Sequence, residues 1–309
     1  MLLLLTACGD KYDEPLIFGA VTWPGYEPAY VARELGYLDA KHAHLAEFTN
    51  TTEVLRAFRN GKLHVAGLTL DEALELRHDI PDLQVFLVAD FSNGADMLMA
   101  RRDIKNLGQL KGKRIGVEKT ALGAYFLSLI LRAAHLPSKD IQVVSLPLDE
   151  HVRAFRAGEV DAVVTYGLVA GELQQEGAEV LFDSTKVPGK IVDTLVVRAA
   201  DAEAHKKSLH EFIKAWFRAL SVIQQDHLHA YPIMAQREQV PVARIVSTLK
   251  GLVLLDKPNN LQQLTGNPPP LLKTSGEIQR ILKESGLTTG SDDLSQLINP
   301  RLVEEAVLD

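Results

Sequence analysis

Short apolar runs alternate with amphipathic segments over the first two thirds of the chain, and this alternation constrains the fold more than any other feature. Asn50 and Thr69 each precede a glutamate by three residues, a capping pattern that favours a helix start. Strands that alternate with helices indicate βαβ units on a mostly parallel sheet. The expected strands are 16–21, 43–48, 64–67 and 83–89, and the expected helices are 28–38, 52–60 and 70–77.

A second α/β block follows, and the chain then becomes helical. A long amphipathic helix at 203–225 opens a tail in which prolines separate further helices. The expected strands of the second block are 96–101, 114–117, 141–144, 162–165, 180–182 and 193–198, and its helices are 121–134, 150–157 and 169–175.

The length of the chain predicts two lobes, because 309 residues exceed what one core usually holds. Two polar segments, 101–106 and 184–192, are the places where the chain would cross between lobes. This double crossing predicts a hinged protein with a ligand cleft at the carboxyl ends of its strands. The expected division is a tether at 1–15, lobe 1 at 16–100 and 193–309, and lobe 2 at 101–192.

The net charge of −7 argues against a nucleic-acid-binding face, which would be basic. The only cysteine, Cys8, ends the sequence Leu5-Thr6-Ala7-Cys8. This order resembles the bacterial lipobox, in which the cysteine is lipidated after a signal peptide is removed. The resemblance implies a lipoprotein tethered to a membrane, on its periplasmic or cell-surface side. An apolar N-terminus without a lipid is the alternative.

Catalytic sequence motifs are missing. We find no G-x-S-x-G, H-E-x-x-H, C-x-x-C, phosphate-binding loop or G-x-G-x-x-G. The histidine pairs, His42 with His44 and His227 with His229, have no third ligand nearby in sequence, so surface histidines are favoured over a metal site. We therefore expect no enzyme activity, no cofactor and no metal.

Polar and aromatic residues gather instead at the junctions between strands and helices. A helix N-terminus offers free N–H donors, and Trp and Tyr offer flat faces with polar edges. Each loop alone is ordinary turn chemistry, but their recurrence at one end of a sheet favours a ligand cleft. The loops are 22–26, 68–71, 90–94, 119–123 and 165–167.

Four stretches of sequence, in this order, resemble one known family. They read YVARELGYLDA, LKGKRIGVEKTALGAYFLSLILRAAHL, HVRAFRAGEVDAVVTYGL and DTLVVRAADAEAHKKSLHEFIKAWFRAL. The family is that of the nitrate-, sulfonate- and taurine-binding proteins of ABC importers, together with the pyrimidine-precursor synthases of thiamine biosynthesis. The resemblance implies an α/β chain with the type II periplasmic-binding-protein fold: two α/β lobes, two crossings and a helical C-terminal segment.

The resemblance also implies a function and a site. It implies a monomer that captures a small ligand and delivers it to an ABC permease in the inner membrane. The ligand would be a sulfonate or taurine-like solute, a nitrate-like ion or an aminopyrimidine precursor of thiamine. The second-lobe motif departs from the family, since it ends in Tyr166-Gly167 where an acidic residue and proline are common. The ligand-binding residues that it implies are Trp23, Gly25, Tyr26, Thr69, Asp71, Asn93, Thr120, Leu122, Gly123, Tyr166 and Asp193.

Four acidic residues, Asp71, Asp90, Glu118 and Asp193, lie near expected strand ends. Carboxylates in a cleft would repel an anion and favour a ligand that bears an amine or a ring nitrogen. Trp23 and Tyr26 would stack on such a group. The alternative is that these acids cap helices in solvent.

Two other functions fit the same sequence. A protein of this fold also serves as the ligand-sensing subunit of a membrane kinase or cyclase, which sequence does not distinguish from transport. The synthases are enzymes associated with a cysteine-rich iron-binding segment, whereas this chain has one cysteine. We therefore favour a binding protein over a synthase.

Overall fold

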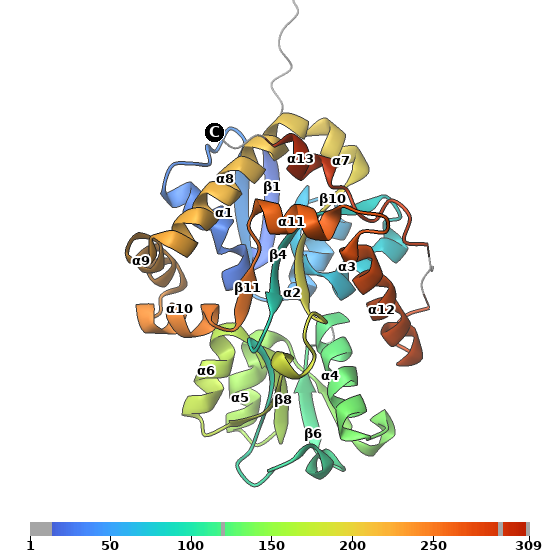
Figure 1. Ribbon diagram of the computed structural model, residues 1–309. Coiled ribbons are helices and arrows are strands. Elements are labelled where there is room, and N and C mark those ends of the chain that lie inside the picture. The colour runs from blue at the N-terminus through green and yellow to red at the C-terminus, as the bar shows by residue number, and fades with distance from the viewer. Residues whose placement is uncertain (1–13, 119–120, 290–292, 307–309) are drawn as a thin grey trace, which may run out of the picture.

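The computed structural model describes residues 14–118, 121–289 and 293–306, which form two lobes, each built on its own sheet (Figure 1). The six-stranded sheet of lobe 1 has the order β11-β4-β10-β3-β1-β2, and the five-stranded sheet of lobe 2 has the order β7-β6-β8-β5-β9. The expected two-lobed α/β architecture is confirmed.

Lobe 1 begins with the predicted strand–helix alternation. β1 pairs in parallel with β2 and with β3, and every residue of β3 is buried. The elements are β1 (Leu16–Val21), η1 (Pro24–Tyr26), α1 (Glu27–Glu34), β2 (Ala43–Phe48), α2 (Thr51–Arg59), β3 (Val65–Thr69), α3 (Leu70–Asp79) and β4 (Leu83–Ser92).

Lobe 2 also alternates strands with helices, on a sheet of five strands. Its central strand is β8, and β6 pairs in parallel with β7 and β8. Its strands are β5 (Asp96–Ala100), β6 (Arg114–Val117), β7 (Gln142–Ser145), β8 (Ala162–Tyr166) and β9 (Glu179–Asp183). Its helices are η2 (Leu107–Leu110), α4 (Ala121–Ala134), η3 (Ser138–Asp140), η4 (Leu148–Glu150), α5 (His151–Arg156), α6 (Gly167–Gln175) and η5 (Ser184–Lys186).

The chain crosses between the lobes twice. The first crossing is the link 93–95 between β4 and β5, and the second runs from β9 to β10 (Val192–Arg198). The expectation that 96–100 belongs to lobe 1 and that the chain crosses at 101–106 differs from the pairing, since β5 pairs with β8 and β9. The strands that follow the crossings, β5 and β10, run antiparallel to both of their neighbours, and so does the edge strand β11 to β4. The other strands point one way within each sheet, so the prediction of mostly parallel sheets is confirmed.

The C-terminal segment returns to lobe 1 and covers it. Helix α8 packs on α1, and α12 packs on α3 and also touches α4 of lobe 2 (Figure 1). The expected helical tail also holds a short strand, β11 (Leu252–Leu254), on the edge of the lobe 1 sheet. Its helices are α7 (Ala199–Ala204), α8 (Lys206–Gln225), α9 (His227–Glu238), α10 (Val242–Leu249), α11 (Lys257–Leu264), α12 (Pro270–Glu284) and α13 (Arg301–Glu305).

Apolar packing is continuous between the lobes. One buried cluster includes Phe18 and Trp216 in lobe 1 together with Ile115 and Phe126 in lobe 2. A second, smaller cluster lies inside lobe 2 around Phe155. The lobes therefore stand closed on each other. Within the described ranges, no helix is both long and apolar enough to cross a membrane.

Candidate functional site

A small cavity lies between the lobes, where the carboxyl ends of several strands meet. Its volume is about 20 Å³, which is room for about one water molecule. A larger ligand therefore enters only when the lobes part or the side chains move. The lining residues are Val21, Trp23, Tyr26, Thr51, Gly67, Thr69, Glu72 and Asp193 from lobe 1 and Asp96, Leu122 and Tyr166 from lobe 2.

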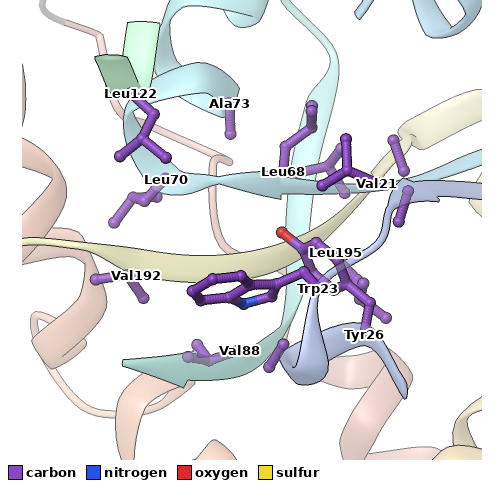
Figure 2. Packing of buried hydrophobic residues seen from close by; sticks show 14 of the residues in the cluster. Val21, Trp23, Tyr26, Leu68, Leu70, Ala73, Val88, Leu122, Val192 and Leu195 are labelled. Carbon is purple, nitrogen blue, oxygen red and sulfur yellow. The ribbon is translucent and has the colours of Figure 1, made fainter. Parts of the chain in front are cut away.

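The loop after β1 supplies the two aromatic side chains of lobe 1. Figure 2 shows Trp23 and Tyr26 among buried apolar side chains of β3, β4 and β10. The indole Nε1 of Trp23 donates a hydrogen bond of 3.0 Å to Asp90 on β4, and the hydroxyl of Tyr26 donates one of 2.7 Å to Asp193 on β10. The loop is therefore held to the central strands by two aromatic–carboxylate hydrogen bonds.

Trp23 also reaches the other lobe. Its ring meets that of Tyr166 edge to face, with centroids 5.7 Å apart and an angle of 85° between the planes. Edge-to-face contact is a favourable geometry for aromatic pairs. This pair of rings thus forms one wall of the cavity from both lobes.

Two glycines allow this loop to pack so closely. A Cβ at Gly25 would lie 1.7 Å from Asp90 Oδ2, so a side chain there would break the Trp23–Asp90 contact. A Cβ at Gly67 would lie 2.9 Å from the Tyr26 ring. Both positions require glycine because backbone and side chain approach each other closely.

Three buried carboxylates line the cavity: Glu72 on α3, Asp96 at the start of β5, and Asp193 on β10. Each is at most 4% exposed. Glu72 Oε2 accepts a hydrogen bond of 3.1 Å from the Thr69 amide and so closes a capping box. Its Oε1, together with Asp96 Oδ2 and Asp193 Oδ2, is buried without a hydrogen-bond partner.

Three more buried acids, Asp71, Asp90 and Glu118, surround these carboxylates. The alternative that the acids near the strand ends face solvent is wrong for Asp71, Asp90, Glu118 and Asp193, none of which is more than 4% exposed.

Burial and mutual repulsion raise the pKa values of this cluster. Burial raises the pKa of Asp96 to about 7 and has the same effect on Asp71 and Asp90. Burial, followed by the charge of Asp90, raises the pKa of Asp193 well above its ordinary value, and burial, followed by Asp71, does so for Glu72. Every neighbouring charge that raises these pKa values is another carboxylate, so the ionisation of one of these groups disfavours the ionisation of the others.

Glu118 occupies the N-terminus of α2 from the opposite lobe. Its Oε1 lies 3.4 Å from both the amide nitrogen and the hydroxyl of Thr52, and the hydroxyl of Tyr166 lies 3.5 Å from its Oε2. A helix N-terminus is a natural position for an anion. Here the protein fills that position with its own carboxylate.

The structure brings most of the expected site residues together. Gly25, Asp71 and Gly123 lie behind the wall, and Gly123 packs so closely that a Cβ there would lie 2.1 Å from the Glu118 carbonyl oxygen. Asn93 does not line the cavity. It is exposed in the first crossing, where its backbone N–H donates a hydrogen bond to the Gly251 carbonyl oxygen. Thr120 and Cys8 lie outside the described residues. The expected residues that line the cavity are Trp23, Tyr26, Thr69, Leu122, Tyr166 and Asp193.

Sequence reasoning missed five lining residues: Val21, Thr51, Gly67, Glu72 and Asp96. In the sequence, Glu72 was recognised only as the last residue of a helix-capping pattern. Its carboxylate both caps α3 and lines the cavity. Asp96 opens a strand that was expected in the other lobe. In the described ranges, no group of three or more His, Cys, Asp and Glu residues is arranged to hold a metal ion.

The sequence model described as "NMT1/THI5 like" matches residues 23–227, which include every residue that lines the cavity except Val21. The chain belongs to the NMT1/THI5-like family. It is also similar to the taurine-binding periplasmic protein of Escherichia coli (strain K12), with 24% identity over 273 residues that cover 84% of this chain and 82% of the relative.

Solved structures share the fold at low sequence identity. The alkanesulfonate-binding protein SsuA from Xanthomonas axonopodis pv. citri, bound to MOPS, matches with a TM-score of 0.73 and 18% identity, and covers 95% of this chain and 98% of its own. The desulfurization enzyme DSZB matches with a TM-score of 0.68 and 17% identity, over 95% and 98% of the two chains. The chain therefore has the fold of periplasmic binding proteins, which an enzyme also uses.

Proposed function

We propose that this protein is a solute-binding protein that captures a small organic solute between its lobes and delivers it to an ABC importer. The observation that carries the proposal is the cavity itself, in which Trp23 and Tyr166 meet from opposite lobes. Closure over a ligand by two hinged lobes is a known class of motion. The taurine-binding and alkanesulfonate-binding relatives support the same function.

A binding role fits the lining better than catalysis does. The only cysteine of the chain is Cys8, so the described residues offer no thiol nucleophile. The buried His151 has its ring nitrogens near the Thr165 hydroxyl and the Leu146 carbonyl, and it does not line the cavity. Among the described residues, the lining includes no serine, cysteine, histidine or lysine, the side chains that most often serve as nucleophile and base in covalent catalysis.

We also propose that Cys8 carries a lipid that holds the protein at a membrane surface, facing the permease. The order Leu5-Thr6-Ala7-Cys8 supports this anchor. A Cys8→Ala variant should move from the membrane fraction to the supernatant when cells are broken. Equal membrane association of the variant and the native protein would contradict the anchor.

Isothermal titration with taurine, ethanesulfonate, nitrate, ethylamine and an aminopyrimidine tests the binding role. Native mass spectrometry of freshly purified protein adds a search for a solute that co-purifies. Trp23→Ala should abolish binding of any solute found, while Trp216→Phe, in the core of α8, should leave it unchanged. If no probe binds and no solute co-purifies, the proposed function is wrong.

A further inference from the structure

Each carboxylate that lines the cavity has a buried oxygen without a hydrogen-bond partner, as do Asp71 and Asp90 behind it. Glu27 on α1 is equally buried, but Arg237 Nε donates a hydrogen bond of 2.9 Å to its Oε2. Glu72 Oε1 and Asp96 Oδ2, in contrast, border the cavity with no partner. A buried carboxylate without a partner is costly, so such oxygens mark a place where another group binds.

The described part of the wall offers no cation to neutralise these acids. Among the described residues, the lining includes no lysine, arginine or histidine. Glu72 and Asp193 face the cavity from lobe 1, and Asp96 faces it from lobe 2. An anion placed between them is opposed by every carboxyl that is ionised, whereas a cation favours their ionised form and then meets opposite charge.

The N-terminus of α2, a position that suits an anion, is already occupied. The Glu118 carboxylate lies at the N-terminus of α2, beside the amide and hydroxyl of Thr52. A sulfonate or nitrate would have to displace Glu118, which lies 4% exposed between the lobes. Displacement would leave one more buried carboxylate without a partner.

We propose that the cleft binds a solute through a protonated nitrogen, which donates hydrogen bonds to Glu72 and Asp96 from the two lobes, and that it rejects simple anions. The rings of Trp23 and Tyr166, 5.7 Å apart, border the same cavity and favour a cation against their faces. Tyr26 holds Asp193 in place through its 2.7 Å hydrogen bond. This inference rests on the proposed function and specifies the charge of the solute.

Three probes of equal length separate charge from shape: propylamine, propanol and propane-1-sulfonate. Ligand-detected NMR at millimolar concentration measures weak binding of such small molecules to the full protein. We expect propylamine to bind at least about tenfold more tightly than propanol, and propane-1-sulfonate to bind more weakly than propanol. If the sulfonate binds as tightly as the amine, the inference is wrong while the proposed function stands.

Two isosteric variants locate the contact. Glu72→Gln keeps the oxygen that caps α3, and Asp96→Asn keeps the shape of the side chain, so each removes mainly charge. Each should weaken propylamine by about tenfold and leave propanol unchanged. Asp103→Asn, an exposed acid of lobe 2, is the matched control and should change neither.

Each negative outcome of the probe and variant experiments has its own meaning. Loss of propylamine and propanol together in both variants would show a structural role for these residues and overturn the inference. Unchanged propylamine affinity in both variants would overturn it as well. If none of the three probes binds the native protein, the inference is wrong, and the wider panel of solutes and the search for a co-purified solute decide the proposed function separately.

Discussion

Replacing Asp96 with asparagine should make the free energy of unfolding of this protein less dependent on pH. Burial raises the pKa of Asp96 to about 7 from an ordinary value of 3.8. A carboxyl group whose pKa is raised by folding contributes its full stability below its unfolded pKa and loses it as the pH rises through the folded pKa. The native protein should therefore become less stable between about pH 5 and pH 8.

The size of the effect follows from the two pKa values. A difference of about three pKa units, at about 1.4 kcal/mol each, makes the ionised side chain cost about 4 kcal/mol above pH 8. About 1.5 kcal/mol of this cost is present at pH 5, so Asp96 accounts for a fall of about 2–3 kcal/mol over the range. Asp71 and Asp90, with pKa values of about 7, act in the same direction.

Urea unfolding followed by circular dichroism at several pH values measures this slope. Asp96→Asn should remove part of the fall, since asparagine does not ionise, and Asp103→Asn should keep the native slope because its side chain is exposed. If the native protein gains stability as the pH rises from 5 to 8, or if Asp96→Asn has the native slope, then Asp96 is not a buried acid with a raised pKa.

Three further predictions concern the aromatic loop. In a Trp216→Phe variant, fluorescence comes from Trp23 alone and should change when a solute binds; a constant spectrum on binding would place the solute elsewhere. Gly25→Ala should weaken solute binding by at least about tenfold in calorimetry, because its Cβ would lie 1.7 Å from Asp90 Oδ2; native affinity would show that the loop adapts. Tyr26→Phe should lower the free energy of unfolding by about 1–3 kcal/mol in urea titration, because its carboxylate partner loses a hydrogen bond; an unchanged midpoint would contradict that.

Sequence predicted the elements best where a continuous apolar run was bounded by turns. The strand 114–117 and the helix 121–134 were predicted to the residue. β11 was missed because its three residues are half-buried or exposed on a sheet edge and offer no alternating pattern. Strand pairing was the larger difficulty, because β5 follows β4 after only three residues, as in a hairpin, yet joins the other sheet.

Part of the site could also be predicted from the sequence. Junction loops such as 22–26 follow directly from the strand–helix alternation, and their position at the cavity needed only the direction of the strands. Asp96 needed the path of the crossing, which depends on contacts far apart in sequence. The partnerless oxygens of Glu72 and Asp193 needed side-chain positions, and only the three-dimensional arrangement shows them.

The distribution of acids between the lobes connects solute charge with closure. Glu72 and Asp193 belong to lobe 1, whereas Asp96 and Glu118 belong to lobe 2, so closing the lobes brings like charges together. That repulsion opposes closure unless the carboxyls are protonated or a cation lies between them. Because a solute shifts a conformational equilibrium only by its differential affinity for the two states, a protonated amine would favour the closed form through the same contacts that bind it. A neutral solute of the same shape would contact the same rings without relieving the repulsion, so selection for charge would arise at the closing step.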